Sequence, residues 1–165
     1  MKFTRALLLT LAALPAMAIA ADSVQLKPGR WIETATPESI MVGGKAQPLA
    51  PEDTKTKTLC LTDAEAAEPR LYFATAEDND LCTAPSGTVA GGKIDLGNIC
   101  RADAASRQEE RVLKIDGSYG PERYAAKASM KTHAGANDVE IRIAVAGRFD
   151  GACKGDEDPR TGTPK

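Results

Sequence analysis

The chain has 165 residues, of which 42% are hydrophobic and only 4% aromatic, and its formal net charge is −2. This length suits one domain with its own core. The acidic balance and the scarcity of aromatic rings disfavour a nucleic-acid partner, which needs a clustered basic surface and stacking platforms.

The N-terminus has the three parts of a secretory signal. Lys2 and Arg5 supply positive charge, an apolar run covers residues 6–14, and small residues follow at 16–21. We therefore predict a signal peptide over residues 1–20 that is removed from the mature protein. The run is too short to span a bilayer, which takes roughly 20 apolar residues, so no integral membrane segment is expected after removal. Loss of Lys2 and Arg5 leaves 19 basic against 23 acidic side chains, a net charge of −4.

The first mature segments are predicted as strands. Residues 27–41 are rich in β-branched and aromatic types, although Pro37 should interrupt the strand before residues 39–42 resume it. Residues 45–53 contain two prolines and are predicted as a loop. Residues 54–61 then alternate threonines with lysine and leucine, which is the period of a strand.

One short helix is predicted next. Thr62 and Glu65 have the spacing of a capping box, and Pro69 should end or kink the helix, so we place it at about residues 63–68. The acidic residues 77–80 follow. They lack the twelve-residue pattern of a calcium loop and are interpreted as an acidic surface loop.

The remainder indicates successive hairpins. Strands are predicted over residues 83–89 and 93–100 around Gly91-Gly92, and then over 111–119, 123–132 and 139–149. The charged residues 101–111 are interpreted as a long exposed connection or a short helix. Apolar residues alternate with polar ones from Val139 to Val145, as in an antiparallel sheet with one buried face. Residues 154–165 contain no apolar residue except proline and are predicted as a disordered tail.

The predicted fold is thus mainly β, a curved antiparallel sheet or partly closed barrel of hairpins. It forms a single domain over residues 21–153, with one short helix and two disulfides.

The four cysteines favour disulfides over zinc. An even count in an exported chain indicates two bridges, and the wide spacing lacks the close pairs of structural zinc sites. In an antiparallel hairpin, the residue numbers of opposite residues have a constant sum. A three-residue loop 90–92 places Val89 opposite Lys93, and their sum of 182 is also that of Cys82 and Cys100, so these two cysteines should lie opposite each other. Cys60 then pairs with Cys153. The other two ways of joining the four cysteines in pairs remain possible from sequence.

The order of these features resembles a bacterial family known as domain of unknown function 3617. The matching segments are the opening at residues 26–33, the step Leu59-Cys60-Leu61-Thr62, Cys82-Thr83, residues 91–94, Cys100, the hairpin from Gly117 to Tyr124, and the closing residues 146–153. The resemblance implies export to the bacterial envelope, hence a periplasmic or secreted protein, and an antiparallel β fold. It implies no activity, substrate or catalytic residue. The charged stretch 101–111 is poorer in glycine than the family pattern.

Catalytic motifs are missing from the sequence. His133 is the only histidine and lies in a polar turn, where it is interpreted as an exposed turn residue. No nucleophile elbow, phosphate loop or zinc-protease motif occurs. We expect no catalytic residue, metal or cofactor, and the acidic clusters are interpreted as solvated loops.

The leading hypothesis is therefore a non-enzymatic envelope protein that binds a small apolar ligand or a protein partner. Trp31, the sole tryptophan, is expected mainly in the core. The possible ligand-lining residues are Trp31, Ile94, Leu96, Ile141, Ile143 and Val145. The alternatives are a structural or inhibitory module with a filled core, and a hydrolase that uses loop carboxylates.

Overall fold

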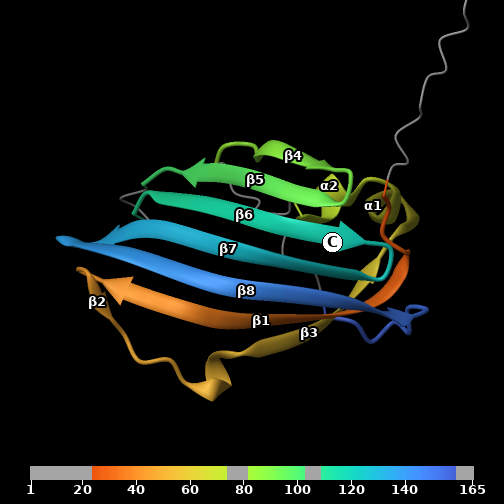
Figure 1. Ribbon diagram of the computed structural model, residues 1–165, viewed down its shortest axis with the longest axis horizontal. Helices are drawn as coiled ribbons and strands as arrows, with labels where there is room; N and C mark the ends of the chain where they lie inside the picture. Colours follow the sequence, from red (N-terminus) through yellow and green to blue (C-terminus); the bar gives the residue numbers. More distant parts are fainter. Residues whose placement is uncertain (1–23, 74–81, 103–108, 159–165) are drawn as a thin grey trace, which may run out of the picture.

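The computed structural model describes residues 24–73, 82–102 and 109–158. These residues form one antiparallel sheet of eight strands and two short α-helices (Figure 1). The elements are β1 (Gly29–Val42), β2 (Lys45–Ala46), a 3-10 turn (Pro51–Asp53), β3 (Lys55–Leu61), α1 (Asp63–Ala67), α2 (Pro69–Phe73), β4 (Ser86–Ala90), β5 (Lys93–Cys100), β6 (Arg111–Gly120), β7 (Arg123–Ala134) and β8 (Asn137–Gly151).

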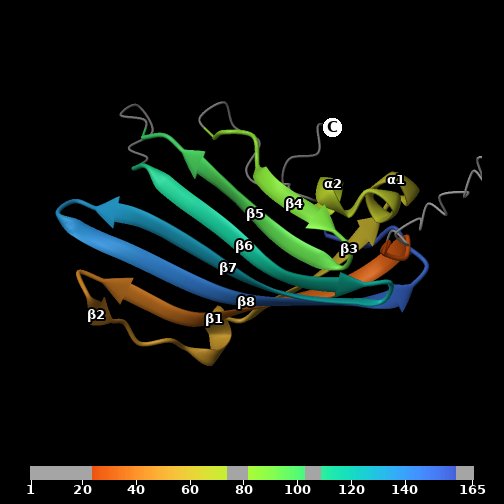
Figure 2. The ribbon, with the colours of Figure 1, turned by 45° about the horizontal axis from the view of Figure 1, so that its top comes forward.

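The sheet is curved and stays open. Its strand order is β2-β1-β8-β7-β6-β5-β4, and β3 pairs with the first half of β1, on the same side of β1 as β2. The first long strand therefore lies beside the last one, while β3 and β4 form opposite edges (Figure 2). The predicted curved antiparallel sheet is confirmed. Of the two forms considered, the described strands take the open one, because β3 and β4 do not pair.

β1 runs through Pro37 where an interruption was predicted. Its pairing with β8 shifts by one residue between Pro37 and Ser39, so that Glu38 is the extra residue of a β-bulge. A bulge leaves one residue out of the ladder and is one of the few places where a sheet tolerates proline. Ile40 and Val42 then pair in the new register with Ile141 and Val139.

The hairpin of β4 and β5 corrects a predicted register. Ala90 pairs with Lys93, so the loop has two residues, not three. Gly91 and Gly92 both have positive φ, at 57° and 78°, as the primed turn of a two-residue hairpin requires. Cys82 nevertheless lies opposite Cys100, in an isolated bridge. The pairing shifts by one residue between this bridge and the Ser86–Gly97 pair of the hairpin.

The helical segment begins as predicted and continues further. The Thr62 hydroxyl accepts a hydrogen bond from the Glu65 amide at 3.3 Å, and the Glu65 carboxylate accepts one from the Thr62 amide at 2.8 Å. Pro69 follows the end of α1 but starts α2, since proline is well tolerated in the first turn of a helix. This second helix, absent from the prediction, brings Tyr72 and Phe73 to the concave side of the sheet.

Two disulfides link distant parts of the chain. They join Cys60 to Cys153 and Cys82 to Cys100, the two pairings favoured above. Structural disulfides of this kind are typical of an oxidising compartment. Among the described helices, none combines the length and apolar character needed to cross a lipid bilayer.

Residues 154–158, expected to begin a disordered tail, contact β1 and β3. The Asp158 carboxylate accepts a hydrogen bond from the Thr58 amide at 2.7 Å, and Arg30 forms ion pairs with Asp156 and Glu157. The predicted signal peptide and residues 159–165 lie outside the described part of the chain.

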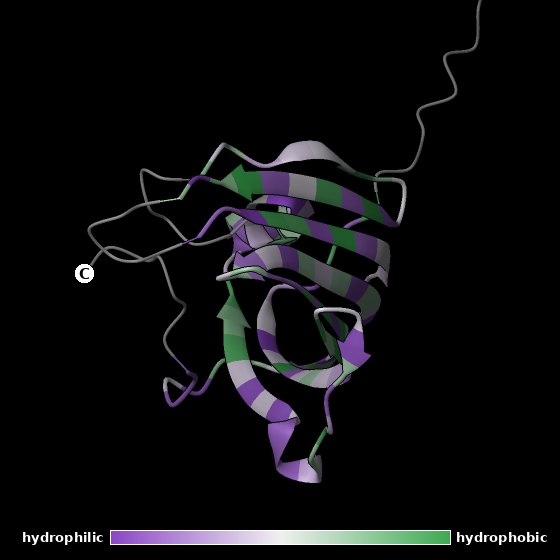
Figure 3. Ribbon diagram, turned by 90° about the vertical axis from the view of Figure 1, so that its left-hand side faces the viewer, coloured by the Kyte–Doolittle hydropathy of each residue, from purple (hydrophilic) through white to green (hydrophobic). Residues whose placement is uncertain are grey.

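The core lies between the concave face of the sheet and the two helices. Hydrophobic and hydrophilic residues alternate along β5 and β6, so each strand turns one row of side chains inward (Figure 3). Trp31 is fully buried there. The buried hydrophobic cluster consists of Leu26, Trp31, Leu59, Leu61, Ala66, Tyr72, Ile94, Leu96, Tyr119, Tyr124 and Ala126.

Candidate functional site

Small residues hollow out the concave face beneath α2. Gly147 of β8 lies opposite Tyr124 of β7, and Ala126 and Ala128 lie opposite Val145 and Ile143. Directly opposed residues of an antiparallel pair share one face of the sheet. Glycine and alanine leave space there, which the rings of Tyr72, Phe73 and Tyr124 only partly fill.

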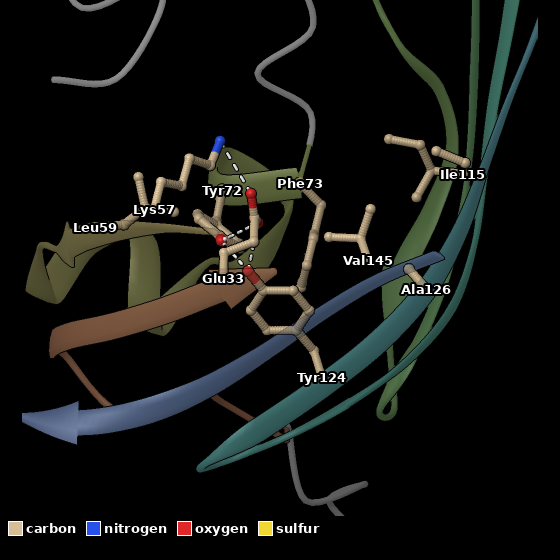
Figure 4. A pocket seen from close by; sticks show the side chains of 10 residues that line it. Glu33, Lys57, Leu59, Tyr72, Phe73, Ile115, Tyr124, Ala126 and Val145 are labelled. Carbon is tan, nitrogen blue, oxygen red and sulfur yellow. Dashed lines mark hydrogen bonds and ion pairs between the residues drawn. The ribbon is translucent and has the colours of Figure 1, made fainter. Parts of the chain in front are cut away.

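A cavity of about 210 Å³ remains at this position (Figure 4). α2 forms one wall, β1 and β3 another, and the sheet curves around the rest. One end is polar and the other is apolar. The lining residues are Glu33, Lys57, Leu59, Tyr72, Phe73, Ile115, Tyr124, Ala126, Ala128 and Val145.

Glu33 is the centre of the polar end. Its Oε2 accepts hydrogen bonds from the hydroxyls of Tyr72 at 2.9 Å and Tyr124 at 2.5 Å. The two tyrosine hydroxyls also contact each other. Oε1 pairs with the Lys57 ammonium at 2.9 Å, and the Glu33 side chain is 14% exposed. Four elements, β1, β3, α2 and β7, thus converge on one carboxylate.

The two tyrosines are held in their neutral form. Burial, together with the negative charge of Glu33, raises the pKa of Tyr72 well above its ordinary value. Burial likewise raises the pKa of Tyr124, with further contributions from Tyr72 and Glu33. Both hydroxyls therefore remain protonated near neutral pH and act as hydrogen-bond donors, not as bases.

An apolar strip continues from the cavity along the same face. Leu113 of β6 lies opposite Met130 of β7, which lies opposite Ile141 of β8, and Ile141 lies opposite Ile40 of β1. All four side chains are only half-buried. The concave face therefore offers an apolar surface that begins at the cavity and extends beyond α2.

The residues predicted to line a ligand site fall into three groups. Val145 lines the cavity. Ile141 and Ile143 are half-buried on the same face, next to it. Trp31, Ile94 and Leu96 belong to the packed core, where Trp31 stacks on Tyr124 with ring centroids 5.5 Å apart.

Sequence reasoning missed the polar end of the site. Glu33 lies two residues after Trp31 and so shares its face of the strand, which was a readable sign of a carboxylate directed inward. Tyr124 begins the alternation of β7, but nothing local connects it with Glu33. Tyr72 follows Pro69, beyond the predicted end of the helix.

The other candidate residues do not converge on the cavity. His133 is exposed in the β7–β8 hairpin and contacts Asp138 at 2.8 Å. Within the described ranges, no group of three histidine, cysteine or acidic side chains is placed to hold a metal ion. Glu33 is the sole carboxylate among the described cavity-lining residues, whereas hydrolysis by paired carboxylates needs two across a cleft. The acidic residues 77–80 lie outside the described residues.

Comparison with known proteins identifies a family but no close relative. Neither the curated proteins nor the solved structures include a chain that matches this one. A family model described as a protein of unknown function, DUF3617, matches residues 26–153, which span the sheet, both helices and all four cysteines. The chain therefore belongs to the DUF3617 family.

Proposed function

We propose that this protein is a non-enzymatic module of the bacterial envelope, exported to the periplasm or secreted, that binds a small and mainly apolar molecule on the concave face of its sheet. The observation that carries the proposal is the cavity under α2 and its continuation as a half-buried apolar strip. Ligand sites of this type are concave, largely apolar and equipped with a few fixed polar groups.

The chemistry of the cavity defines the ligand class. Ile115, Ala128 and Val145 favour a hydrocarbon body. At the other end, Glu33 is already engaged by two tyrosines and a lysine, while the Lys57 side chain is 52% exposed. An ammonium has three N–H donors, so Lys57 can bind a polar or anionic head group in addition to Glu33. A ligand with an apolar body and one polar end fits this arrangement best.

A cavity-filling variant tests the proposal. We expect the wild-type protein to bind N-phenyl-1-naphthylamine, a neutral apolar fluorophore, and palmitate as its competitor, both saturably. Ala128→Phe places a ring in the cavity and should weaken both affinities by about tenfold or more, equivalent to about 1.4 kcal/mol of lost apolar contact. Ala144→Phe is the matched control, because Ala144 lies opposite Lys127 on the outer face of the same sheet.

Native mass spectrometry of protein isolated from the envelope fraction supplies an independent readout. A bound mass that is extracted by organic solvent supports the proposal. No retained mass, together with no saturable probe binding, would favour the alternative of a structural module with a filled core. Equal loss of binding in both phenylalanine variants would exclude the concave face as the site.

A further inference from the structure

Two arginines lie directly opposite each other on the outer, convex face of the sheet. Arg123 of β7 is in register with Arg148 of β8, and both side chains are exposed. Directly opposed residues of an antiparallel pair have their Cβ atoms about 5 Å apart, and side chains of like charge placed directly opposite each other destabilise a sheet. The pair is therefore an unfavourable feature of the unliganded protein.

Neither arginine has a carboxylate as its in-register neighbour on the adjoining strands. The residue opposite Arg148 on β1 is Ile32, and the residue opposite Arg123 on β6 is Gly120. The acidic pair Asp95 and Asp116 is different, because Lys127 lies opposite Asp116 on β7. The arginine pair, in contrast, has no oppositely charged residue in register on either adjoining strand.

Nearby carboxylates neutralise the pair only in part. Arg148 contacts Asp150 at 3.1 Å, but Asp150 is shared with Arg30 at 3.4 Å. Glu122, next to Arg123 in sequence, is paired with Lys27, which lowers the pKa of the Glu122 carboxyl, and the charge of Arg123 makes a smaller contribution in the same direction. Arg123 itself takes part in no salt bridge within the described part of the chain. Arg30 is in turn paired with Asp156 and Glu157, which leaves Asp150 to Arg148, so Arg123 is the member of the pair that no described salt bridge neutralises.

A shallow hollow of about 620 Å³ lies between the two arginines. Ala125 and Ala146 form its floor as the next opposed pair on the same face. Ser118 lies opposite Ala125 and lines the hollow, to which it adds a hydroxyl. Small residues between the two arginines leave room for a compact group beside their guanidinium groups and the Ser118 hydroxyl.

We propose that Arg123 and Arg148 bind a phosphate group in this hollow. Two guanidinium groups supply the planar, paired N–H donors that suit phosphate oxygens, and the anion relieves the repulsion between them. The site is on the opposite face of the sheet from the proposed apolar site and does not depend on it. The phosphate can belong to a free solute or to an anionic lipid head group.

Titration with inorganic phosphate tests the site directly. In ¹⁵N-labelled protein, the side-chain Nε–Hε signals of Arg123 and Arg148 should shift saturably with phosphate, but not with chloride at equal ionic strength. Arg123→Gln and Arg148→Gln should each weaken the affinity by about tenfold or more, as expected for a lost hydrogen bond to a charged group. Lys114→Gln removes a charge elsewhere on the outer face and should leave the affinity unchanged.

Sedimentation with vesicles separates the two sources. Binding to phosphatidylglycerol vesicles but not to phosphatidylcholine vesicles, lost in Arg123→Gln, assigns the site to a lipid head group. Saturable phosphate shifts without vesicle binding assign it to a phosphorylated solute. The proposal is overturned if chloride reproduces the shifts, or if Arg123→Gln and Arg148→Gln bind phosphate as the wild type does.

Discussion

Replacing Gly147 by alanine should force the Tyr124 ring out of its place in the core. A Cβ atom at position 147 would lie 2.0 Å from Cε1 and 2.1 Å from Cζ of Tyr124. The φ angle of Gly147 is not positive, so alanine suits the backbone and the conflict is purely between side chains. The ring cannot simply shift, because it is packed against Trp31, Tyr72 and Phe73.

The cost follows from two terms. Overpacking of a filled core costs about 1–3 kcal/mol. Displacement of the ring also breaks the hydrogen bond from the Tyr124 hydroxyl to Glu33, which contributes about 1.5–3 kcal/mol because the acceptor is charged. Alanine also lowers the conformational entropy of the unfolded chain, which recovers at most about 1 kcal/mol of stability. We expect a net loss of about 1.5–6 kcal/mol in the free energy of unfolding.

Urea denaturation with intact disulfides, followed by circular dichroism, measures this loss. Gly120→Ala is the control, because no heavy atom lies within 4 Å of a Cβ at that position, and it should change stability by less than about 1 kcal/mol. In a Tyr124→Ala background the cost of Gly147→Ala should largely disappear, since the two residues are in contact. Equal stability of Gly147→Ala and Gly120→Ala would refute the steric reasoning.

Three further predictions concern stability. The Cys60–Cys153 bridge spans 93 positions and the Cys82–Cys100 bridge 18, so the chain-entropy model predicts losses of about 5 and about 3 kcal/mol for the paired serine variants, and the reverse order in urea denaturation would contradict it. The raised pKa values of Tyr72 and Tyr124 mean that the folded state keeps protons which the unfolded state releases above pH 10. Stability should therefore fall above pH 10, and less steeply in a Tyr72→Phe/Tyr124→Phe variant; equal slopes would show that the hydroxyls ionise alike in both states. Thr62→Ala removes the N-cap of α1 and should cost about 1 kcal/mol in thermal unfolding, whereas Thr56→Ala in β3, on the exposed edge strand, should cost less.

The sequence predicted most elements because their signals are local. Alternation in β3 and β8 is visible within each strand, and the capping box at Thr62 and Glu65 marks the start of α1. The predicted disulfide pairs agree with the structure, although the hairpin loop used to argue for one of them was too long by one residue. The shorter loop moves the pairing by one residue, and a shift of one residue in the opposite direction between Ser86 and Cys82 restores the predicted cysteine pair.

Apart from the inward direction of Glu33, the polar end of the candidate site was beyond such reasoning. Lys57, Glu33, Tyr72 and Tyr124 are separated by many residues, and only the folded sheet brings them together. The same holds for Arg123 and Arg148, which become a pair through the register of β7 against β8. Sequence alone decided which residues alternate and which cysteines are available. The tertiary structure decided which strands are neighbours, because the order and register of strands depend on contacts between distant segments that no local pattern encodes.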